Sequence, residues 1–466
     1  RLSYRALDVE QVGSVYESMM GFAVRSLPGR ALALRPSGIV IDLDALLAQP
    51  GTRRAAYLQE HADCTLSAAA AAALRDGRTA EDLLAALGRR VGEQTPQPLP
   101  PGALFLQPGE ERRRSGSHYT PRELTAPTLR TTLAPIWAAL GDRPRPEQIL
   151  DLAICDPAMG SGAFLVEACR QLASALCAAW DTHGGMPPLP PDEEPHLLAR
   201  RLIAQRCLYG VDKNPFAVSL AKLSLWLVTL ARDHAFTFLD HALKHGDSLV
   251  GLRDAQIGAF HWQPQKLDSG PLFAGVTQRV DAVRGLRSKL WAIEDSESDY
   301  DRRRDAWKEA EDVLYDVRRV ANLCIASFFA ASKDKDREAL RQRAYLLVKD
   351  WQQSGQRDAV DEQLEALTHG PQPLRPLHWD IEFPEVFLRK NPGFDAIVGN
   401  PPFAGKNNIA ASSHPAFVDW LKSLHPESHG NADLCAHFFR RAFSLLRDGG
   451  SFGLLATNTI AQGDTR

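Results

Sequence analysis

Hydrophobic positions fall at helical spacing in the first quarter of the chain. Ala6–Phe22 shows this spacing, and Ser67–Gly77 and Ala80–Gly88 add capping residues at their ends. The pattern therefore predicts a mainly helical N-terminal region over residues 1–110. The proline-rich stretch Pro96–Gly102 is interpreted as a linker near the end of this region, because proline stiffens an extended chain.

After this stretch, short apolar runs of β type alternate with segments of helical spacing. The runs are Gln148–Ile154, Cys207–Val211, Phe394–Val398 and Ser451–Thr457. The helical segments are Phe164–Trp180, Pro215–Arg232 and Asp433–Leu446. Such alternation is typical of a mostly parallel sheet covered by helices, and it predicts an α/β fold.

The interval 256–380 interrupts this alternation. Its middle part, Val280–Gln353, mixes charges with apolar residues at helical spacing, which predicts an inserted helical hairpin or small bundle. Its charged positions are either a solvated face of packed helices or a nucleic-acid contact. The first interpretation is favoured because basic runs are answered by nearby acids. The predicted sheet domain therefore has two parts, residues 111–255 and 381–466.

The composition is that of a globular protein. Of 466 residues, 44% are hydrophobic and 24% charged, which excludes collagen, coiled-coil and wholly disordered chains. A net charge of -3 excludes attraction to nucleic acid by bulk charge, so any such contact needs a local patch. No apolar run approaches the roughly 20 residues that span a bilayer. The seven cysteines show neither disulfide-framework nor zinc spacing, so we expect no metal and a cytoplasmic location.

A glycine loop is the first candidate for binding chemistry. In Ile149–Ala168 an apolar run ends at Asp156, and Gly160 and Gly162 precede a helix. Glycines let a backbone approach a ligand closely, and the helix N-terminus favours anionic or acceptor groups. The loop therefore predicts a nucleotide-type cofactor. It is not a dinucleotide fingerprint, because the third glycine and the later ribose acid are missing.

Two further acids follow short apolar runs. Asp212, in GVDKNP, stands at the carboxyl end of a predicted strand, where it can accept from both hydroxyls of a ribose. A cap for the next helix is the alternative role. Asp247, in HGDSLVG, is placed to accept from an adenine amino group, although a turn explains it equally well.

The segment FDAIVGNPPF, Phe394–Phe403, adds acceptors to a predicted strand end. Two consecutive prolines remove two donors, so the Asn400 and Pro401 carbonyl oxygens can face a ligand beside the Asn400 carboxamide oxygen. Phe403 supplies an aromatic face. Acceptors around an amino group with a ring beside it are what a flipped adenine needs. A turn after a core strand is the alternative.

Five motifs stand in the order found in the gamma class of amino-methylating DNA methyltransferases. They are GSHYTP (Gly116–Pro121), DPAMGSG (Asp156–Gly162), GVDKNP (Gly210–Pro215), GDSL (Gly246–Leu249) and NPPF (Asn400–Phe403). The chain resembles the large adenine-N6 methyltransferases of restriction-modification and phage-defence systems, of type IIG, BREX or DISARM kind. It departs from many relatives in Met159, where they carry cysteine, and in Phe403, where tyrosine is commoner.

The resemblance implies a Rossmann-like methyltransferase sheet with helices on both faces. It makes residues 111–255 the cofactor-binding half and residues 381–466 the catalytic half. The residues implied to bind S-adenosyl-L-methionine are Tyr119, Thr120, Pro121, Asp156, Ala158, Gly160, Gly162, Asp212, Lys213, Asp247 and Ser248. The residues implied to act on the target base are Asn400, Pro401, Pro402 and Phe403.

The implied partner is double-stranded DNA, and other defence-system subunits are further candidates. Lys406, Asn407 and Asn408 are candidate DNA contacts after the catalytic loop, although a flexible surface loop explains them equally well. A target-recognition domain is expected beyond Arg466. Two other functions stay open. One is a non-catalytic DNA-recognition or assembly subunit that retains the cofactor fold, and the other is methylation of RNA or of protein glutamine.

Overall fold

The computed structural model divides the chain into two compact units. They are Ser14–Gly116 and the remainder, Arg1–Gly13 with Ser117–Arg466. The residues described are 22–62, 64–93, 95–108, 120–189, 194–229, 238–263, 279, 282, 283, 285, 297–370, 372–405, 409, 413–428 and 431–461. The helix expected at Ala6–Phe22 lies outside these residues except for Phe22, which begins strand β1 (Phe22–Arg25).

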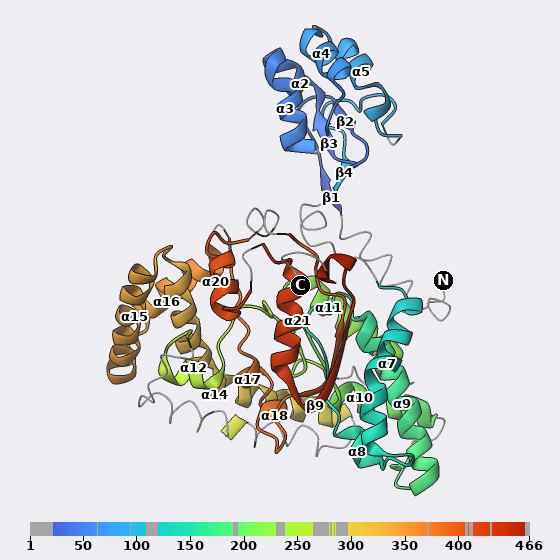
Figure 1. Ribbon diagram of the computed structural model, residues 1–466, viewed down its shortest axis with the longest axis vertical. Coiled ribbons are helices and arrows are strands. Elements are labelled where there is room, and N and C mark those ends of the chain that lie inside the picture. The colour runs from blue at the N-terminus through green and yellow to red at the C-terminus, as the bar shows by residue number, and fades with distance from the viewer. Residues whose placement is uncertain are drawn as a thin grey trace. The chain divides into compact units, whose positions relative to one another are not determined.

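In the first unit, the described residues form two antiparallel strand pairs and four α-helices (Figure 1). Strand β1 pairs with β4 (Phe105–Pro108), and β2 (Ala31–Ala33) pairs with β3 (Val40–Asp42). The helices are α2 (Leu43–Ala48), α3 (Gly51–Ala62), α4 (Ala68–Asp76) and α5 (Ala80–Leu87). The predicted bounds of α5 are confirmed, because Thr79 and Asp82 form a capping box at its start.

The interpretation of Pro96–Gly102 as a linker is wrong. Leu99 exchanges two backbone hydrogen bonds with Ala31 of β2, at 3.0 and 2.8 Å, and the Gly102 N–H donates to the Leu27 carbonyl at 2.9 Å. Proline does favour an extended chain here, but that chain pairs with the rim of a small sheet. The segment therefore belongs to the first unit.

The second unit is built on a parallel sheet of five described strands (Figure 1). In chain order these are β5 (Ile154–Asp156), β6 (Leu208–Asp212), β7 (Leu243–His245), β8 (Phe394–Gly399) and β9 (Leu446–Leu454). Their order across the sheet is β7-β6-β5-β8-β9, and every neighbouring pair is parallel. The predicted α/β fold with a mostly parallel sheet is confirmed at this level.

Two of the predicted strands have different bounds. The run Gln148–Ile154 begins in helix α8 (Pro146–Leu150) and only Ile154 is in β5, because Pro146 suits the first helical turn and Gln148 accepts from the Arg145 N–H at 2.8 Å. Strand β9 begins at Leu446, earlier than the expected Ser451, and ends at Leu454. The first half of β9 contains two glycines and no continuous apolar run, so the apolar pattern did not predict its start.

Helices pack on both faces of the sheet, as the alternation along its strands requires. Ile154 and Val398 point into a core shared with α7 (Arg122–Leu140), α9 (Ala163–His183), α10 (Pro195–Arg206) and α11 (Pro215–Thr229). Their chain neighbours Cys155 and Ile397 point into a second core, shared with α17 (Trp379–Glu382), α18 (Pro384–Phe387) and α21 (Leu434–Leu445).

The helices between β7 and β8 gather on the side of the sheet away from α7 and α9 (Figure 1). They include α12 (Asp254–Ala259), α14 (Glu297–Phe329), α15 (Asp334–Ser354) and α16 (Asp358–His369). Lys244 of β7 lies 3.4 Å from Glu311 of α14 and 3.5 Å from Glu382, and Arg318 of α14 pairs with both acids. These charges of α14 are therefore packed against the sheet. No described helix is long and apolar enough to cross a membrane.

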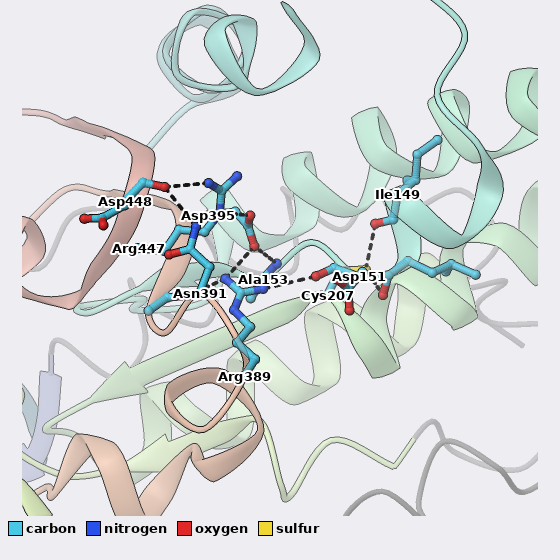
Figure 2. Close-up of polar contacts among 11 residues, drawn as sticks. Ile149, Asp151, Ala153, Cys207, Arg389, Asn391, Asp395, Arg447 and Asp448 are labelled. Atoms are coloured by element: carbon cyan, nitrogen blue, oxygen red, sulfur yellow. Dashed lines mark hydrogen bonds and ion pairs between the residues drawn. The ribbon is translucent and has the colours of Figure 1, made fainter. Parts of the chain in front are cut away.

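A buried carboxylate joins the amino ends of three neighbouring strands (Figure 2). Asp395, near the start of β8, accepts from the Ala153 N–H and from Arg389, both at 2.8 Å. Its other oxygen is bonded to Arg447, at the start of β9. Because Ala153 leads into β5, this cluster fixes the relative positions of β5, β8 and β9. It thereby fixes where their carboxyl ends lie.

Candidate functional site

The strand order reverses between β5 and β8. From β5 the chain continues to β6 and β7 on one side, whereas β8 and β9 lie on the other. Open α/β sheets bind ligands outside the strand ends at such a topological switch point. Asp156 is the last residue of β5, and Asn400 follows the last residue of β8. Two predicted site residues therefore meet at this point.

The glycine loop joins Asp156 to helix α9. Gly160 and Gly162 have φ angles of 52° and 84°, which side chains rarely adopt. A Cβ on Gly162 would lie 3.2 Å from the Cβ of Ala221 in α11. The loop thus packs its backbone closely, and α9 begins directly after it at Ala163.

Asp156 is a buried acid at the base of this loop. Its side chain Oδ1 accepts from the Ala158 N–H at 3.0 Å, and the residue is 1% exposed. Burial raises the pKa of its carboxyl to about 8, the Ala158 N–H opposes this, and the charge of Asp212 adds to it. The negative charge of Asp156 is therefore costly in the absence of a cationic partner.

Asp212 ends strand β6, as predicted, and it holds the glycine loop. Its Oδ2 accepts from the Gly160 N–H at 2.9 Å, and its Oδ1 accepts from the Asn214 N–H at 2.8 Å. The predicted alternative, a cap for the next helix, falls to Asn214, whose Oδ1 accepts from the Phe216 N–H at 2.9 Å in the first turn of α11. Ribose binding by Asp212 stays a prediction.

Asp247 lies in the loop after β7 and is buried. Its Oδ1 accepts from the Leu249 N–H at 3.0 Å, and its Oδ2 lies 3.4 Å from the Lys213 ammonium. The Lys213 side chain is 58% exposed, so this pair contributes little to stability. Lys213 also lies 5.6 Å from the centre of the Phe417 ring. The structure therefore brings together two residues predicted for cofactor binding.

Ser248 connects the β7 loop to the glycine loop. Its buried hydroxyl donates to the Pro157 carbonyl at 2.6 Å. The Ser248 carbonyl in turn accepts from the Trp379 indole N–H at 3.1 Å, and the next carbonyl, that of Leu249, accepts from the Trp420 indole N–H at 2.7 Å. The two tryptophans were not among the predicted site residues, because no local pattern marks a tryptophan that serves a distant loop.

Asn400 carries the most conspicuous polar group at the switch point. Its Nδ2 donates to the Thr120 hydroxyl at 3.3 Å, across 280 positions of sequence. Its Oδ1 is buried and makes no hydrogen bond with the residues described. Buried polar atoms almost always have a partner, so an orphaned acceptor at a strand end points to a missing donor.

The residues after Asn400 present their groups differently. Pro401 is buried, whereas the Phe403 side chain is 39% exposed and available for contact. Ala404 then accepts from the Leu434 N–H at 2.9 Å, and its own N–H donates to Asp433 at 3.2 Å. Helix α21 thereby holds the end of the Asn-Pro-Pro-Phe loop.

Four of the predicted site residues lie outside the described residues, namely Tyr119, Lys406, Asn407 and Asn408. Thr120 is buried and Pro121 precedes the first turn of α7, which brings this segment to Asn400. Pro402 is half-buried. Within the part of the chain that the structure describes, no group of three His, Cys, Asp or Glu residues could hold a metal ion.

Two family models match the chain. The Eco57I restriction-modification methylase model matches residues 206–465, more than half of the sequence. The model described as MmeI, DNA-methyltransferase domain, matches residues 145–254. These matches include the glycine loop, the ends of β6 and β7, and the Asn-Pro-Pro-Phe loop.

One relative and one solved structure extend this comparison. A protein of Methanocaldococcus jannaschii named "Putative type II restriction enzyme and methyltransferase" is 23% identical over 340 residues, which covers 68% of this chain and 27% of that protein. The type IIL restriction-modification enzyme MmeI, solved in complex with DNA, is 15% identical with a TM-score of 0.33. That match covers 91% of this chain and 42% of the MmeI chain. The chain thus spans less than half of either protein.

Proposed function

Because the chain belongs to the Eco57I restriction-modification methylase family, we propose that it is a site-specific DNA adenine-N6 methyltransferase. The observation that carries this proposal is the buried Asn400 Oδ1, an acceptor without a described partner. It stands beside the glycine loop at the switch point of the sheet. An amino group of a flipped base would supply the donor that this oxygen lacks.

S-adenosylmethionine fits the residues at these strand ends. Gly160 and Gly162 hold the loop backbone at positive φ angles, and the start of α9 offers amide N–H groups to a carboxylate. The bound cofactor supplies an electrophilic methyl group, and the C–S electron pair returns to sulfur as the N–C bond forms. The residues proposed to hold it are Thr120, Pro121, Asp156, Ala158, Gly160, Gly162, Asp212, Lys213, Asp247 and Ser248.

Asn400 and Pro401 act on the nucleophile in this proposal. The adenine amino nitrogen is a poor nucleophile, because its lone pair is delocalised into the ring. The Asn400 Oδ1 and a carbonyl oxygen of Asn400 or Pro401 accept the two amino hydrogens, which favours a pyramidal nitrogen and stabilises its developing positive charge. One of these hydrogens then leaves as a proton to water. Alignment of nitrogen, methyl and sulfur lowers the barrier further.

Phe403 and Pro402 hold the base rather than the amino group. The exposed Phe403 ring can stack on an adenine, which is worth about 1–3 kcal/mol for a base in comparable sites. That gain offsets part of the few kcal/mol needed to extrude a base from a duplex. Pro402 has no N–H, so the loop presents acceptors without a competing donor.

The match to the restriction-modification methylase family supports DNA as the substrate and indicates the biological setting. Restriction-modification methylases act on specific DNA sequences, and we propose this substrate class and a role in restriction-modification or phage defence. Lys406, Asn407 and Asn408 stay predicted DNA contacts. Extrusion of the base depends on such phosphate contacts, because a chain with a net charge of -3 has no bulk attraction to DNA.

The test is to identify the methylated product. The full-length protein is incubated with methyl-labelled S-adenosylmethionine and, in separate reactions, mixed-sequence DNA, RNA and a protein lysate. Each product is digested and its labelled component identified. Labelled N6-methyladenine from DNA alone supports the proposal. Label only in RNA or in glutamine contradicts it, and DNA binding without any labelled product identifies a recognition or assembly subunit instead.

A further inference from the structure

We infer that Trp379 and Trp420 are positioning residues that set selectivity for the adenine base of the cofactor. Both indoles are buried and donate to consecutive carbonyls, those of Ser248 and Leu249, at 3.1 and 2.7 Å. These carbonyls belong to the loop that carries Asp247. The inference rests on the proposed function, in which Asp247 accepts from the cofactor's adenine amino group.

The two indoles reach this loop from different parts of the chain. Trp379 begins helix α17, which follows the inserted helices, whereas Trp420 lies in α20 (Phe417–Leu424), beyond the Asn-Pro-Pro-Phe loop. The Trp420 ring packs against Phe328 and Phe329 at the end of α14, with ring centres 5.1 and 5.7 Å apart. The insertion thereby acts as a support for Trp420, and Trp420 supports the loop.

The hydrogen bonds of the loop explain why its backbone position matters. The Leu249 N–H, which shares a peptide unit with the Ser248 carbonyl, donates to Asp247 Oδ1 at 3.0 Å, so the peptide that Trp379 anchors also orients the Asp247 carboxylate. The Val250 N–H, which shares a peptide unit with the Leu249 carbonyl, donates to the Asp247 backbone carbonyl at 3.0 Å, so the peptide that Trp420 anchors fixes the Asp247 backbone. The Ser248 hydroxyl donates to the Pro157 carbonyl at 2.6 Å, so the peptide that Trp379 anchors also reaches the glycine loop. A displacement of either carbonyl therefore moves the acceptor proposed for the adenine amino group.

Removing the Trp379 N–H takes this donor from the buried Ser248 carbonyl, and removing the Trp420 N–H leaves the Leu249 carbonyl with a long contact of 3.5 Å to Arg441. The loop then shifts toward another donor, because an unpaired buried polar group is costly. Such a shift weakens recognition of the adenine amino group more than it weakens the other cofactor contacts, which come from the ends of β5 and β6. A residue that only stabilises the fold would lower affinity for every cofactor analogue by the same factor.

The experiment compares two methyl-free ligands by calorimetry. S-adenosylhomocysteine carries the 6-amino donor, and S-inosylhomocysteine replaces it with a carbonyl acceptor. The parent full-length protein should favour the adenosyl compound by about tenfold or more, the scale of one hydrogen bond at a polar site. In Trp420→Phe and Trp379→Phe this preference should fall at least about threefold, because each variant keeps an aromatic side chain and loses the N–H.

Trp262→Phe is the matched control. The Trp262 ring packs on the same Phe328 ring, with ring centres 5.3 Å apart. Its indole N–H donates no hydrogen bond to any of the described residues. Its preference should equal that of the parent. Thermal unfolding checks that each variant is folded. If Trp379→Phe or Trp420→Phe fails to fold, the other variant still tests the inference.

The inference is overturned if Trp379→Phe and Trp420→Phe lose affinity for both ligands by the same factor, or if their preference for the adenosyl compound is unchanged. Either result leaves the proposed function standing. The inference is also overturned if the parent protein binds both compounds equally, because Asp247 then does not recognise the adenine amino group. A parent protein that binds neither compound overturns the proposed function as well.

Discussion

Gly399 lies directly against the carboxylate of Asp156. A Cβ built on Gly399 would stand 2.6 Å from Asp156 Oδ1, a separation that real Cβ atoms essentially never show. The end of β8 therefore touches the end of β5 with no side chain between them. This contact places the Asn-Pro-Pro-Phe loop next to the glycine loop, so acceptor groups and the proposed cofactor share one site.

Gly399→Ala should damage this contact. The added methyl group forces the two strand ends apart, and such overpacking costs typically about 1–3 kcal/mol of folding stability. We expect a lower urea midpoint and weaker binding of S-adenosylhomocysteine. Gly285→Ala is the control, because no described atom lies within 4 Å of a Cβ at Gly285. Unchanged stability and binding in Gly399→Ala would contradict the described packing.

The Asp156 carboxyl predicts a stability change with pH. Its pKa is raised from 3.8 to about 8 in the folded state, so between these values the folded protein binds a proton that the unfolded chain has lost. Stability from this group is present at low pH and is lost as pH rises toward 8, by up to about 1.4 kcal/mol per pH unit.

Asp156→Asn isolates this effect, because the amide keeps the Oδ1 acceptor for Ala158 and cannot ionise. Burial lowers the pKa of His378 and of His437 to about 4, and the stability change from these residues is complete above their usual pKa of 6.5. Urea unfolding should therefore be measured from pH 6.5 to 8. We expect the free energy of unfolding to fall more steeply with pH for the parent protein than for Asp156→Asn. Parallel curves would contradict the raised pKa of the Asp156 carboxyl.

Ser248→Ala should affect cofactor affinity through the glycine loop. Loss of the 2.6 Å bond leaves the buried Pro157 carbonyl without this donor, and we expect KM for S-adenosylmethionine to rise about tenfold with little change in kcat. Ser174→Ala is the matched control, because the Ser174 hydroxyl donates to a carbonyl of its own helix, at Arg170. An equal KM in both variants would show that Ser248 does not position the loop.

Asp395→Ala tests the cluster at the opposite ends of the strands. Removing one partner of a buried ion pair typically costs about 3–5 kcal/mol, because the remaining charges lose their counter-charge. Here Arg389 and Arg447 would both lose theirs. We expect a large fall in the urea midpoint. Asp76→Ala, which breaks an exposed pair with Arg75, should leave that midpoint unchanged, and similar effects of both substitutions would argue against the strand-end cluster.

The main strands and the strand-end residues were predictable because each is specified locally. Apart from Asp395 near its start, β8 is an apolar run that ends at Gly399, and the polar residue Asn400 follows it directly. The same holds for Asp212 at the end of β6. The short strands of the first unit escaped prediction, because the three residues of Ala31–Ala33 are too few to show a period.

Contacts between distant residues were not predictable. The bond from Gly160 to Asp212 spans 52 positions, and that from Trp420 to the Leu249 carbonyl spans 171. Nothing local to either residue marks its partner, because the packing of several helices decides which groups meet. The glycine loop was thus correctly placed from the sequence, whereas the side chains that hold it were found only in the structure.

The most direct test of the account is the activity of Asn400→Ala. N6-methyladenine formed in DNA is quantified by mass spectrometry, and S-adenosylhomocysteine binding is measured on the same preparations. We predict methylation by the parent protein, no detectable methylation by Asn400→Ala, and equal cofactor binding by both. Near-normal methylation by Asn400→Ala would contradict the assignment of its buried oxygen as the acceptor for the target amino group.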